Sequence, residues 1–513
     1  MKRKVILMFI RTICVMCTIL VTSTSILAKE TPVPGGILKV VMTRPATEFG
    51  YPPKIASRDR NFAPPFFDRL LTIAEHGVYK AELATSWNTS ADGKSITFKL
   101  RRGVKFHDGT DFNAQAVKSN FAALLPPNPV IIDGITSVDV VDPYTVRVNL
   151  SGFNNLILYQ IASNFECYMY SPTALQKNGV DWATTHPVGT GPFKLESWER
   201  TGRMKMVRNP DYWEKGLPYL DGIEIDAVAE GLTQMASFKA GKVHAIYDAI
   251  HSIAAQLRDA GYPVLIAPGS LYSLSFDIKN NKILADKRVR QAIEYALDKE
   301  GICSGPGLNI YKPVYQIVPE TSSAYNKACP PRKYDPAKAK QLLAEAGYPN
   351  GFTFKAFLQD STWRDGLTAV QANLASIGIK MDINYVSTAV INDIILKGKL
   401  EPGATCQMGT AVYSYALFPI DYFWRSDALE YPFVVKPPGI DDLIDKAKSA
   451  REDASMIRTT QDIVKRLYDD ETVVPLWVTP RIAVVDKSVQ NAGYFINGDQ
   501  LNNKFGRSTW LKK

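Results

Sequence analysis

Residues 82–121, which read ELATSWNTSADGKSITFKLRRGVKFHDGTDFNAQAVKSNF, decide the fold of this chain. Apolar and polar residues alternate over positions 95–100, and this period of two predicts a β-strand with one buried face. Asp108-Gly109 is a turn dipeptide. Asn113 then stands where a helix N-cap belongs, with apolar residues on one helical face behind it. A strand, a tight turn and a capped amphipathic helix indicate an α/β protein.

The N-terminus is typical of a secretory signal peptide. Basic residues within the first eleven positions precede the apolar run of residues 13–20, and Ala28 is a small residue suited to cleavage. We therefore expect a signal peptide over residues 1–28. An uncleaved anchor is the alternative, although the run is short for a membrane span. Cys17 lacks the small preceding residues of a lipoprotein site, so the sequence predicts an exported protein without a lipid.

Charge and length limit the possible classes of protein. The chain carries 60 Lys and Arg against 51 Asp and Glu, a formal charge of +9. Residues 1–28 hold four bases and no acid, so their removal leaves +5. The charges are interspersed, which indicates a solvated surface and argues against a nucleic-acid partner. The remaining residues, at roughly 150 per domain, predict two or three domains.

The cysteines and histidines do not follow a metal-binding pattern. Four cysteines lie beyond residue 28, and no CxxC or Cys/His spacing occurs among them. Cys303 and Cys329 flank a Gly/Pro-rich loop, and either a disulfide or two free buried thiols fits the sequence. The five histidines are scattered, which argues against direct nickel binding; capture of a metal through a chelator stays open. We expect no cofactor.

Later segments continue the alternation of strands and helices. Residues 271–276 alternate as a strand, after which the chain is expected to cross to another lobe. Asp286 caps a helix whose apolar residues recur at spacings of three and four, with an expected end at Gly301. Asp335-Pro336 begins a further helix, which is expected to stop at Gly347.

Four blocks of sequence stand in a definite order along the chain. The opening stretch is the first. The others are residues 187–193 (PVGTGPF) with 208–213 (RNPDYW), residues 286–298 (DKRVRQAIEYALD) and residues 334–347 (YDPAKAKQLLAEAG). In order and spacing, the set resembles solute-binding protein family 5, the dipeptide, oligopeptide and nickel group of ABC importers, across nearly the whole chain after residue 28.

This resemblance implies an α/β fold of two lobes that close on a ligand, with a hinge between them. We place lobe 1 at residues 29–276, with an extra subdomain at about 62–185, lobe 2 at 277–483, and a return to lobe 1 at 484–513. The resemblance also implies a periplasmic, mainly monomeric protein that passes a small solute to an ABC permease and ATPase. Within the blocks, Gly189 and Gly191 with Pro192 are expected to fix turns, and Tyr212 and Trp213 to fill the core.

Residues 413–425 (YSYALFPIDYFWR) are expected to govern ligand choice. Peptide binders of the family usually carry an Asp-Pro pair in a comparable loop, and the carboxylate pairs with the free ammonium of the peptide. If Pro419 is the matching proline, Phe418 replaces that Asp. A buried ammonium would then lose its partner at a cost of about 3–5 kcal/mol. Asp421 could serve instead, so a di- or oligopeptide ligand is the alternative.

Aromatic residues of the same segment suit a ring or a sugar face. Tyr415, Phe418, Tyr422 and Trp424 could stack on it, and Arg425 could bind a phosphate or carboxylate. A sugar-phosphate opine of the agrocinopine kind is therefore our candidate ligand. Candidate contacts elsewhere in the chain are Tyr51, Tyr272, Ser273, Trp363, Arg364 and Trp477.

An enzyme is not expected. The chain contains no Gly-x-Ser-x-Gly or His-Glu-x-x-His motif and no phosphate-binding Gly-rich loop with Lys. Gly189-Thr-Gly191 is followed by proline and not by a helix, so it is a poor phosphate loop. We expect no catalytic residues, and an exported hydrolase is a remote alternative.

Overall fold

The computed structural model describes residues 31–55, 57–73, 78–125, 132, 134–278, 280–359, 364–398, 400–401, 405–411, 415–434, 436–492 and 506–513. Val33–Lys513 form one compact unit. The predicted signal peptide over residues 1–28 lies outside the described residues, as do His76 and Trp363. Within the described ranges, no helix combines the length and apolar character that a membrane crossing requires.

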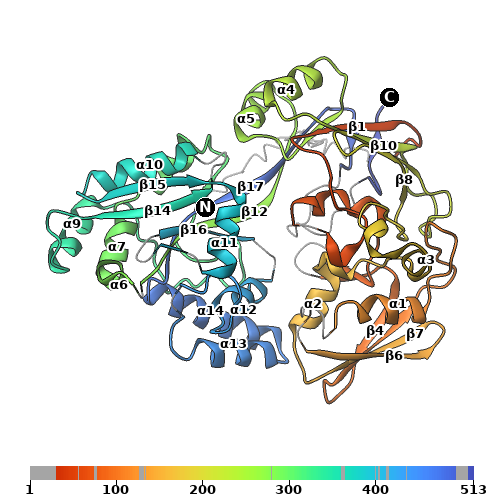
Figure 1. Cartoon of the computed structure of the whole chain (residues 1–513), viewed down its shortest axis with the longest axis horizontal. Coiled ribbons are helices and arrows are strands. Elements are labelled where there is room, and N and C mark those ends of the chain that lie inside the picture. Colours follow the sequence, from red (N-terminus) through yellow and green to blue (C-terminus); the bar gives the residue numbers. More distant parts are fainter. Residues whose placement is uncertain are drawn as a thin grey trace, which may run out of the picture. The chain divides into compact units, whose positions relative to one another are not determined.

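The largest sheet has eleven strands and is built around two long central ones (Figure 1). β12 (Val264–Phe276) and β17 (Val473–Val485) span 13 residues each and pair antiparallel. β16, β14 and β15 follow on the β12 side; β11, β1, β10, β9 and β8 follow on the β17 side; β13 also pairs with β17. The bounds are β1 Ile37–Met42, β8 Phe193–Trp198, β9 Arg203–Arg208, β10 Gly222–Ala227, β11 Ala245–Tyr247, β13 Lys312–Pro313, β14 Thr353–Gln359, β15 Lys380–Val386 and β16 Thr405–Ala411.

The opening stretch lies in a separate four-stranded sheet of order β4-β5-β7-β6 (Figure 1). The predicted strand is confirmed as β5 (Ser95–Leu100), where every second residue from Ile96 is buried. The predicted N-cap is confirmed as well, because Asn113 Oδ1 accepts a hydrogen bond from the backbone N–H of Ala116 at 3.0 Å. The bounds of the other strands outside the large sheet are β2 Leu71–Ile73, β3 Tyr79–Ala81, β4 Ala84–Thr89, β6 Ile135–Asp142, β7 Thr145–Leu150, β18 Val489–Gln490 and β19 Trp510–Leu511.

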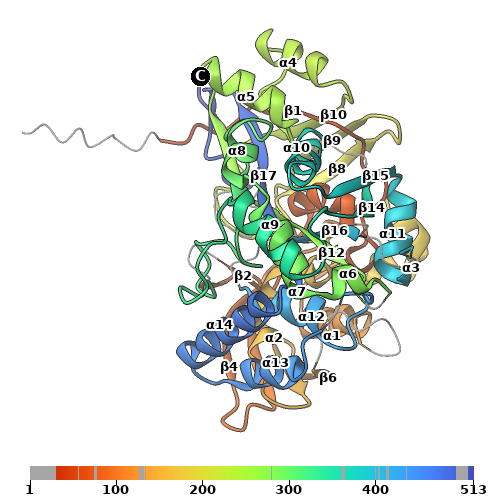
Figure 2. The same cartoon turned by 90° about the vertical axis from the view of Figure 1, so that its left-hand side faces the viewer.

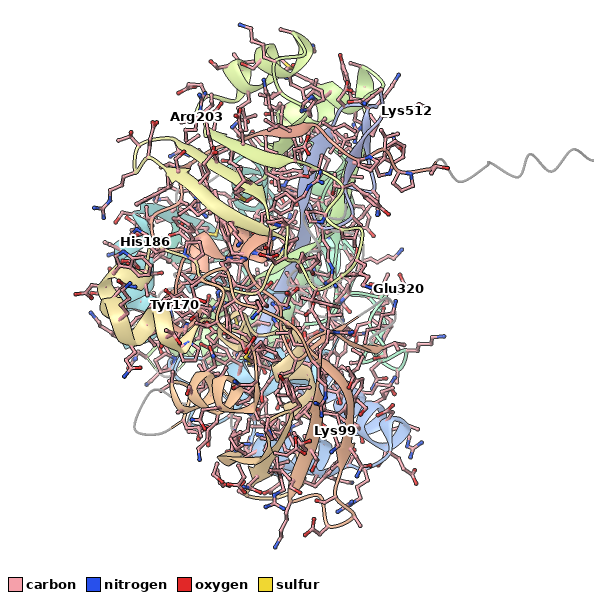
Figure 3. All side chains as sticks on the ribbon, turned by 90° about the vertical axis from the view of Figure 1, so that its right-hand side faces the viewer. Lys99, Tyr170, His186, Arg203, Glu320 and Lys512 are labelled. Atoms are coloured by element: carbon pink, nitrogen blue, oxygen red, sulfur yellow. The ribbon has the colours of Figure 1, made fainter. Side chains whose placement is uncertain are left out.

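Helices cover the sheets, and each half of the molecule has its own set. Figure 2 shows α7, α9, α13 and α14 beside the β14–β16 half, and Figure 3 shows the opposite side, where Lys99 of β5 and Arg203 of β9 are exposed. The bounds are α1 Ala114–Ala122, α2 Leu156–Ser163, α3 Pro172–Ala183, α4 Gly231–Lys239, α5 His251–Asp259, α6 Lys282–Ala285, α7 Lys287–Tyr295, α8 Lys299–Ser304, α9 Pro336–Glu345, α10 Arg364–Ala375, α11 Thr388–Lys397, α12 Leu417–Trp424, α13 Ile440–Ser449 and α14 Asp453–Asp469.

Two predicted helix starts are confirmed and one predicted end is wrong. The carboxylate of Asp286 accepts from the N–H of Arg288 at 2.8 Å, and that of Asp335 accepts from the N–H of Lys338 at 2.9 Å. The helix after Asp286 ends at Tyr295 and not at Gly301. Asp298 caps a second helix there, α8, by accepting from the N–H of Gly301. A side-chain cap inside an otherwise regular apolar pattern therefore divides the segment in two.

The central strand β12 is longer than the sequence pattern indicates. Alternation predicts a strand over 271–276, but pairing with β17 begins at Val264 and continues to Ser275. Register shifts interrupt the pairing between Ala267 and Ser270 and again between Tyr272 and Ser273. Because β-bulges break the period of two, the first half of this strand does not alternate in sequence.

Gly191 occupies a position where no side chain fits. A Cβ there would lie 2.3 Å from the carbonyl carbon of Phe66 and 2.4 Å from the backbone nitrogen of Phe67. We expect Gly191→Ala to lower the free energy of unfolding by about 1–3 kcal/mol, since the neighbouring backbone must move. Urea unfolding of purified protein measures the change. Gly202→Ala is the matched control, because nothing lies within 4 Å of its Cβ position; equal losses in both variants would contradict the prediction.

Candidate functional site

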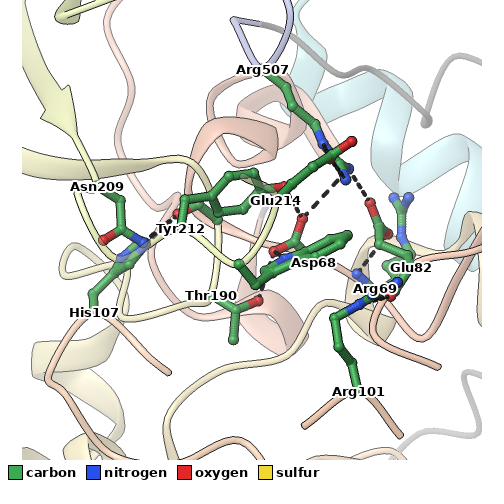
Figure 4. Close-up of polar contacts among 12 residues, drawn as sticks. Asp68, Arg69, Glu82, Arg101, His107, Thr190, Asn209, Tyr212, Glu214 and Arg507 are labelled. Carbon is green, nitrogen blue, oxygen red and sulfur yellow. Dashed lines mark hydrogen bonds and ion pairs between the residues drawn. The ribbon is translucent and has the colours of Figure 1, made fainter. Parts of the chain in front are cut away.

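Asp68 lies at the centre of a buried polar network in which two sequence blocks meet (Figure 4). Its carboxylate accepts hydrogen bonds from Thr190 Oγ1 at 2.9 Å, Tyr212 Oη at 3.1 Å and Trp213 Nε1 at 2.9 Å. Burial, and next the nearby Glu82 carboxylate, raise the pKa of Asp68 to about 7. The aromatic residues that were expected to fill the core therefore also hold a buried acid in place.

Arg507, close to the C-terminus, supplies positive charge to the same network (Figure 4). Its guanidinium lies 2.7 Å from Glu82 Oε1 and 3.8 Å from Asp68 Oδ1, and it also pairs with Glu214. The Arg507 side chain is only 7% exposed; its partners Asp68 and Glu82 are buried as well, whereas Glu214 is 38% exposed. Sequence reasoning missed Asp68 and Arg507, because Arg507 and Glu82 are 425 positions apart.

His107 joins the opening stretch to the 187–193 block. Its Nε2 lies 3.0 Å from the carbonyl oxygen of Gly191, and its backbone N–H donates to the carbonyl of Gly189 at 2.8 Å. Burial lowers the pKa of His107 to about 4, so the ring is neutral at pH 7. The expectation that the two glycines fix the backbone is confirmed, since a Cβ on either would overlap the backbone of Phe66.

The 286–298 block is also held by buried polar side chains. Arg290 donates to four backbone carbonyls at 2.7–2.9 Å, two of them at positions 470 and 471, directly before β17. Glu294 lies between Lys299 Nζ at 2.6 Å and Arg332 Nη1 at 3.0 Å. All these polar groups face other parts of the chain. In this block, the polar side chains of Arg290 and Glu294 therefore hold the fold together.

The candidate aromatic residues in and just before α12 do not form one surface. Tyr415 stacks on Tyr159 of α2 with ring centroids 5.2 Å apart, and Phe418 lies 5.5 Å from the same ring. Tyr422 is half exposed and donates to Glu430 at 3.1 Å. Trp424 is buried in the core on the α13 and α14 side. Two of the four rings thus face α2, one faces solvent and one lies inside the protein.

The charged candidates of α12 already have ionic partners. Asp421 Oδ2 lies 3.1 Å from Lys448 Nζ, and Asp421 Oδ1 lies 3.6 Å from Arg425 Nη1. Arg425 in turn lies 2.6 Å from Asp445 Oδ1, and the nearby carboxylates, Asp445 first, raise its pKa despite burial. An incoming ammonium or phosphate would have to displace these partners.

Tyr272 and Arg481 come from the two long central strands. Tyr272 is paired in register with Trp477, and burial raises the pKa of its phenol to about 12. Arg481 Nη1 lies 3.5 Å from Asp248 Oδ1 and 3.5 Å from Asn61 Oδ1. Residues from a short helical segment, a loop and a central strand therefore meet here. Ser273, the next candidate along β12, is almost fully buried.

The first residue of α10, Arg364, lies near the same strands. Its guanidinium carbon is 4.3 Å from the centroid of the Tyr385 ring, and the residue is exposed. Two residues further on, a Cβ at Gly366 would lie 3.3 Å from the Trp477 indole. Trp477 stacks on Tyr311 at 5.7 Å, so α10 begins beside β17. Trp363 lies outside the described residues.

Tyr51 and the cysteines lie apart from this region. The ring of Tyr51 packs edge-on against Tyr170, with centroids 5.4 Å apart, in the core beneath β1. Cys303 and Cys329 are free and buried thiols, so the structure contains no disulfide between them. Among the residues that the structure describes, no group of three His, Cys, Asp or Glu side chains is arranged to hold a metal ion.

The fold and these sites define a solute-binding protein. The chain matches the family of bacterial extracellular solute-binding proteins, family 5, over residues 78–429, and it belongs to that family. It is therefore a two-lobed transport binding protein of the ABC importer type and not an enzyme.

Individual relatives bind different solutes. The glutathione-binding protein GsiB of Shigella dysenteriae is 31% identical over 85% of this chain and 87% of its own length. Among solved structures, the peptide complex of DppA from Helicobacter pylori has a TM-score of 0.80 at 24% identity, covering 94% of this chain and 99% of that one. AgaA of A. tumefaciens R10, in complex with agropinic acid, has a TM-score of 0.78 at 25% identity, covering 93% and 99%.

Proposed function

We propose that this chain captures a small carboxylate-bearing solute between its two lobes and delivers it to a membrane permease and ATPase. The lobes are residues 29–276 and 277–483, with 484–513 returning to the first and an extra subdomain at about 62–185. The topology supports this division, because β12 and β17 lie between the two halves of the large sheet. One buried apolar cluster lies almost entirely within the residues of the first lobe, and another almost entirely within those of the second.

The protein acts in the periplasm as a monomer after cleavage behind Ala28. The order of basic, apolar and small residues over positions 1–28 supports this part of the proposal. The intact mass of the protein purified from its own cells gives the cleavage position. Native mass spectrometry of the same sample also reports the number of chains and any solute that remains bound.

The proposed class of ligand rests mainly on the ion pairs that Asp421 already makes. Phe418 offers no charge, and the nearest acid on its helix already pairs with Lys448 at 3.1 Å and Arg425 at 3.6 Å. A free ammonium at this place would have to compete with two cations. We infer that the ligand is not anchored by an ammonium near α12.

Two arginines beside the central strands are the proposed carboxylate-binding residues. A guanidinium has five N–H donors, so Arg481 can bind a ligand oxygen in addition to Asp248. Arg364 is exposed at the start of α10, next to the strand that carries Arg481. Tyr272 lies on β12, in register with Trp477, and supplies a ring and a hydroxyl. Charge-assisted bonds to a carboxylate contribute about 1.5–3 kcal/mol each.

Similarity to binding proteins of known ligand favours two acids of this class. Glutathione has two carboxylates, and the GsiB relatives that bind it are about one-third identical to this chain. An opine is the second candidate, favoured by the likeness to AgaA with agropinic acid. A sugar-phosphate opine has less support, because Trp424 is buried and Arg425 is paired with Asp445. Dipeptides and longer peptides, as bound by DppA, remain the alternative.

Isothermal titration with reduced glutathione, its N-acetyl form and its dimethyl ester tests this proposal. We expect the ester to bind roughly 10- to 100-fold more weakly than glutathione, since charge-assisted contacts to the carboxylates are lost. N-acetylation should change the affinity less. Arg364→Gln and Arg481→Gln should each weaken binding over the same range, while Arg425→Gln, whose side chain faces Asp445, is the matched control.

Other results of these binding experiments would point to a peptide, to an opine or sugar phosphate, or to an enzyme. Binding of free-amine dipeptides that is abolished by Asp421→Ala would overturn the inference drawn from α12. A thermal shift with sugar phosphates or opine acids but not with glutathione would select the second candidate, because a ligand stabilises the folded state by mass action. Turnover of any of these solutes would contradict a binding function.

A further inference from the structure

Asn155, directly before α2, caps the C-terminal end of α13, a helix distant in sequence. Its side-chain amide donates to the carbonyl oxygens of Ala447 at 2.7 Å and Ala450 at 3.2 Å. Its backbone N–H donates to the carbonyl of Lys448 at 3.0 Å. The last carbonyls of a helix have no partner within that helix. Here a residue nearly 300 positions away supplies three donors to them.

Arg451 extends this contact in the opposite direction. It follows α13 and donates to the carbonyl oxygens of Ala91 and Asp92, each at 3.1 Å, in the turn between β4 and β5. Its guanidinium carbon also lies 4.9 Å from the centroid of the Phe153 ring. Both partners belong to the four-stranded sheet and its loops, whereas Arg451 belongs to the α13 and α14 side.

Apolar side chains fill the middle of the same contact. Leu156 of α2 is fully buried and packs in the cluster formed mainly by residues 317–473. Tyr159 stacks on Tyr415 and touches Phe418. We call residues 91–93 and 153–159, together with 415–418 and 447–451, the seam. In the proposed division, residues 91–93 and 153–159 belong to the extra subdomain of the first lobe, and residues 415–418 and 447–451 belong to the second lobe.

We propose that the seam is a closure latch, which forms when the two lobes meet and sets the fraction of ligand-free protein that is closed. Asn155 and Arg451 are its polar positioning residues, and Leu156 and Tyr159 are its apolar part. All of these contacts are lost if the lobes separate. They therefore stabilise the closed state and not the open one. The proposal rests on the two-lobed binding function but not on the identity of the ligand.

Small-angle scattering of the ligand-free protein tests the latch. The wild-type radius of gyration should match the value calculated for residues 33–513, and Asn155→Ala/Arg451→Ala should have a larger one. Loss of these contacts should lower the ratio of closed to open protein about 5- to 30-fold. Arg451→Ala alone, at an exposed position, gives a smaller change in the same direction and removes no core contact.

The control is Arg458→Ala, an exposed arginine of α14, the helix that follows Arg451. It should scatter like the wild type. Circular dichroism and thermal unfolding show whether each variant is folded, so an expanded but folded double variant supports the latch. Equal radii of gyration for the wild type and the double variant would overturn it. Because no ligand is added, this result is independent of whether glutathione binds.

Discussion

Arg507→Met should lower the free energy of unfolding by about 3–5 kcal/mol, the cost of removing one partner from a buried ionic group. The variant leaves Asp68, Glu82 and Glu214 close together without the guanidinium that pairs with each of them. Methionine fills a similar apolar volume, so the loss comes mainly from charge. Urea unfolding monitored by tryptophan fluorescence measures it.

Arg203→Met is the matched control for this prediction. Arg203 (Figure 3) pairs with Asp226 at 2.6 Å on β9 and β10, but the two side chains are 49% and 34% exposed. Exposed ion pairs contribute about 0–1 kcal/mol, since water screens them. The two variants remove the same charge from the same residue type. Similar losses in both would show that burial of the Arg507 cluster has no special effect on stability.

His107→Gln should make the protein less sensitive to acid than the wild type. The pKa of an unfolded histidine is about 6.5, whereas burial lowers that of His107 to about 4 in the folded state. Between these values the unfolded chain binds a proton that the folded chain does not. The wild type therefore loses stability as the pH falls from about 6.5 to 4, by about 3 kcal/mol in total.

The free energies of unfolding of both proteins at pH 7 and at pH 4.5 test the direction and the size of this pH effect. Carboxylates titrate in both proteins, so the difference between the two pH dependences isolates the imidazole. Glutamine keeps an N–H donor for the carbonyl of Gly191, which lies 3.0 Å from the ring in the wild type. If the free energy of unfolding decreased equally in both proteins, or more steeply in the variant, a neutral buried His107 would be contradicted.

Local patterns in the sequence predicted the parts of the fold that depend on near neighbours. The strand over 95–100 and the caps at Asn113, Asp286 and Asp335 involve residues within three positions of each other. The end of the helix after Asp286 was missed, because a second cap at Asp298 is hidden inside a continuous apolar pattern. Short-range periodicity cannot show such a break.

The candidate site depends on contacts that no local pattern contains. Residues 413–425 were singled out by their resemblance to a loop of the family's peptide binders, but Tyr159, whose ring contacts Phe418, is far away in the chain. Lys448, which pairs with Asp421, lies 27 positions downstream on another helix. Arg481 was not predicted at all, since its partner Asn61 is 420 positions away. Tyr272 and Arg364 were named, and they lie beside the same central strands.

The position of Arg507 also affects the order in which the protein can fold. The acids at positions 68, 82 and 214 are synthesised long before their common partner at position 507. This cluster therefore cannot reach its final stability before residue 507 has left the ribosome. Until then the three carboxylates lack their shared cation and repel one another, which delays the final folding of this region.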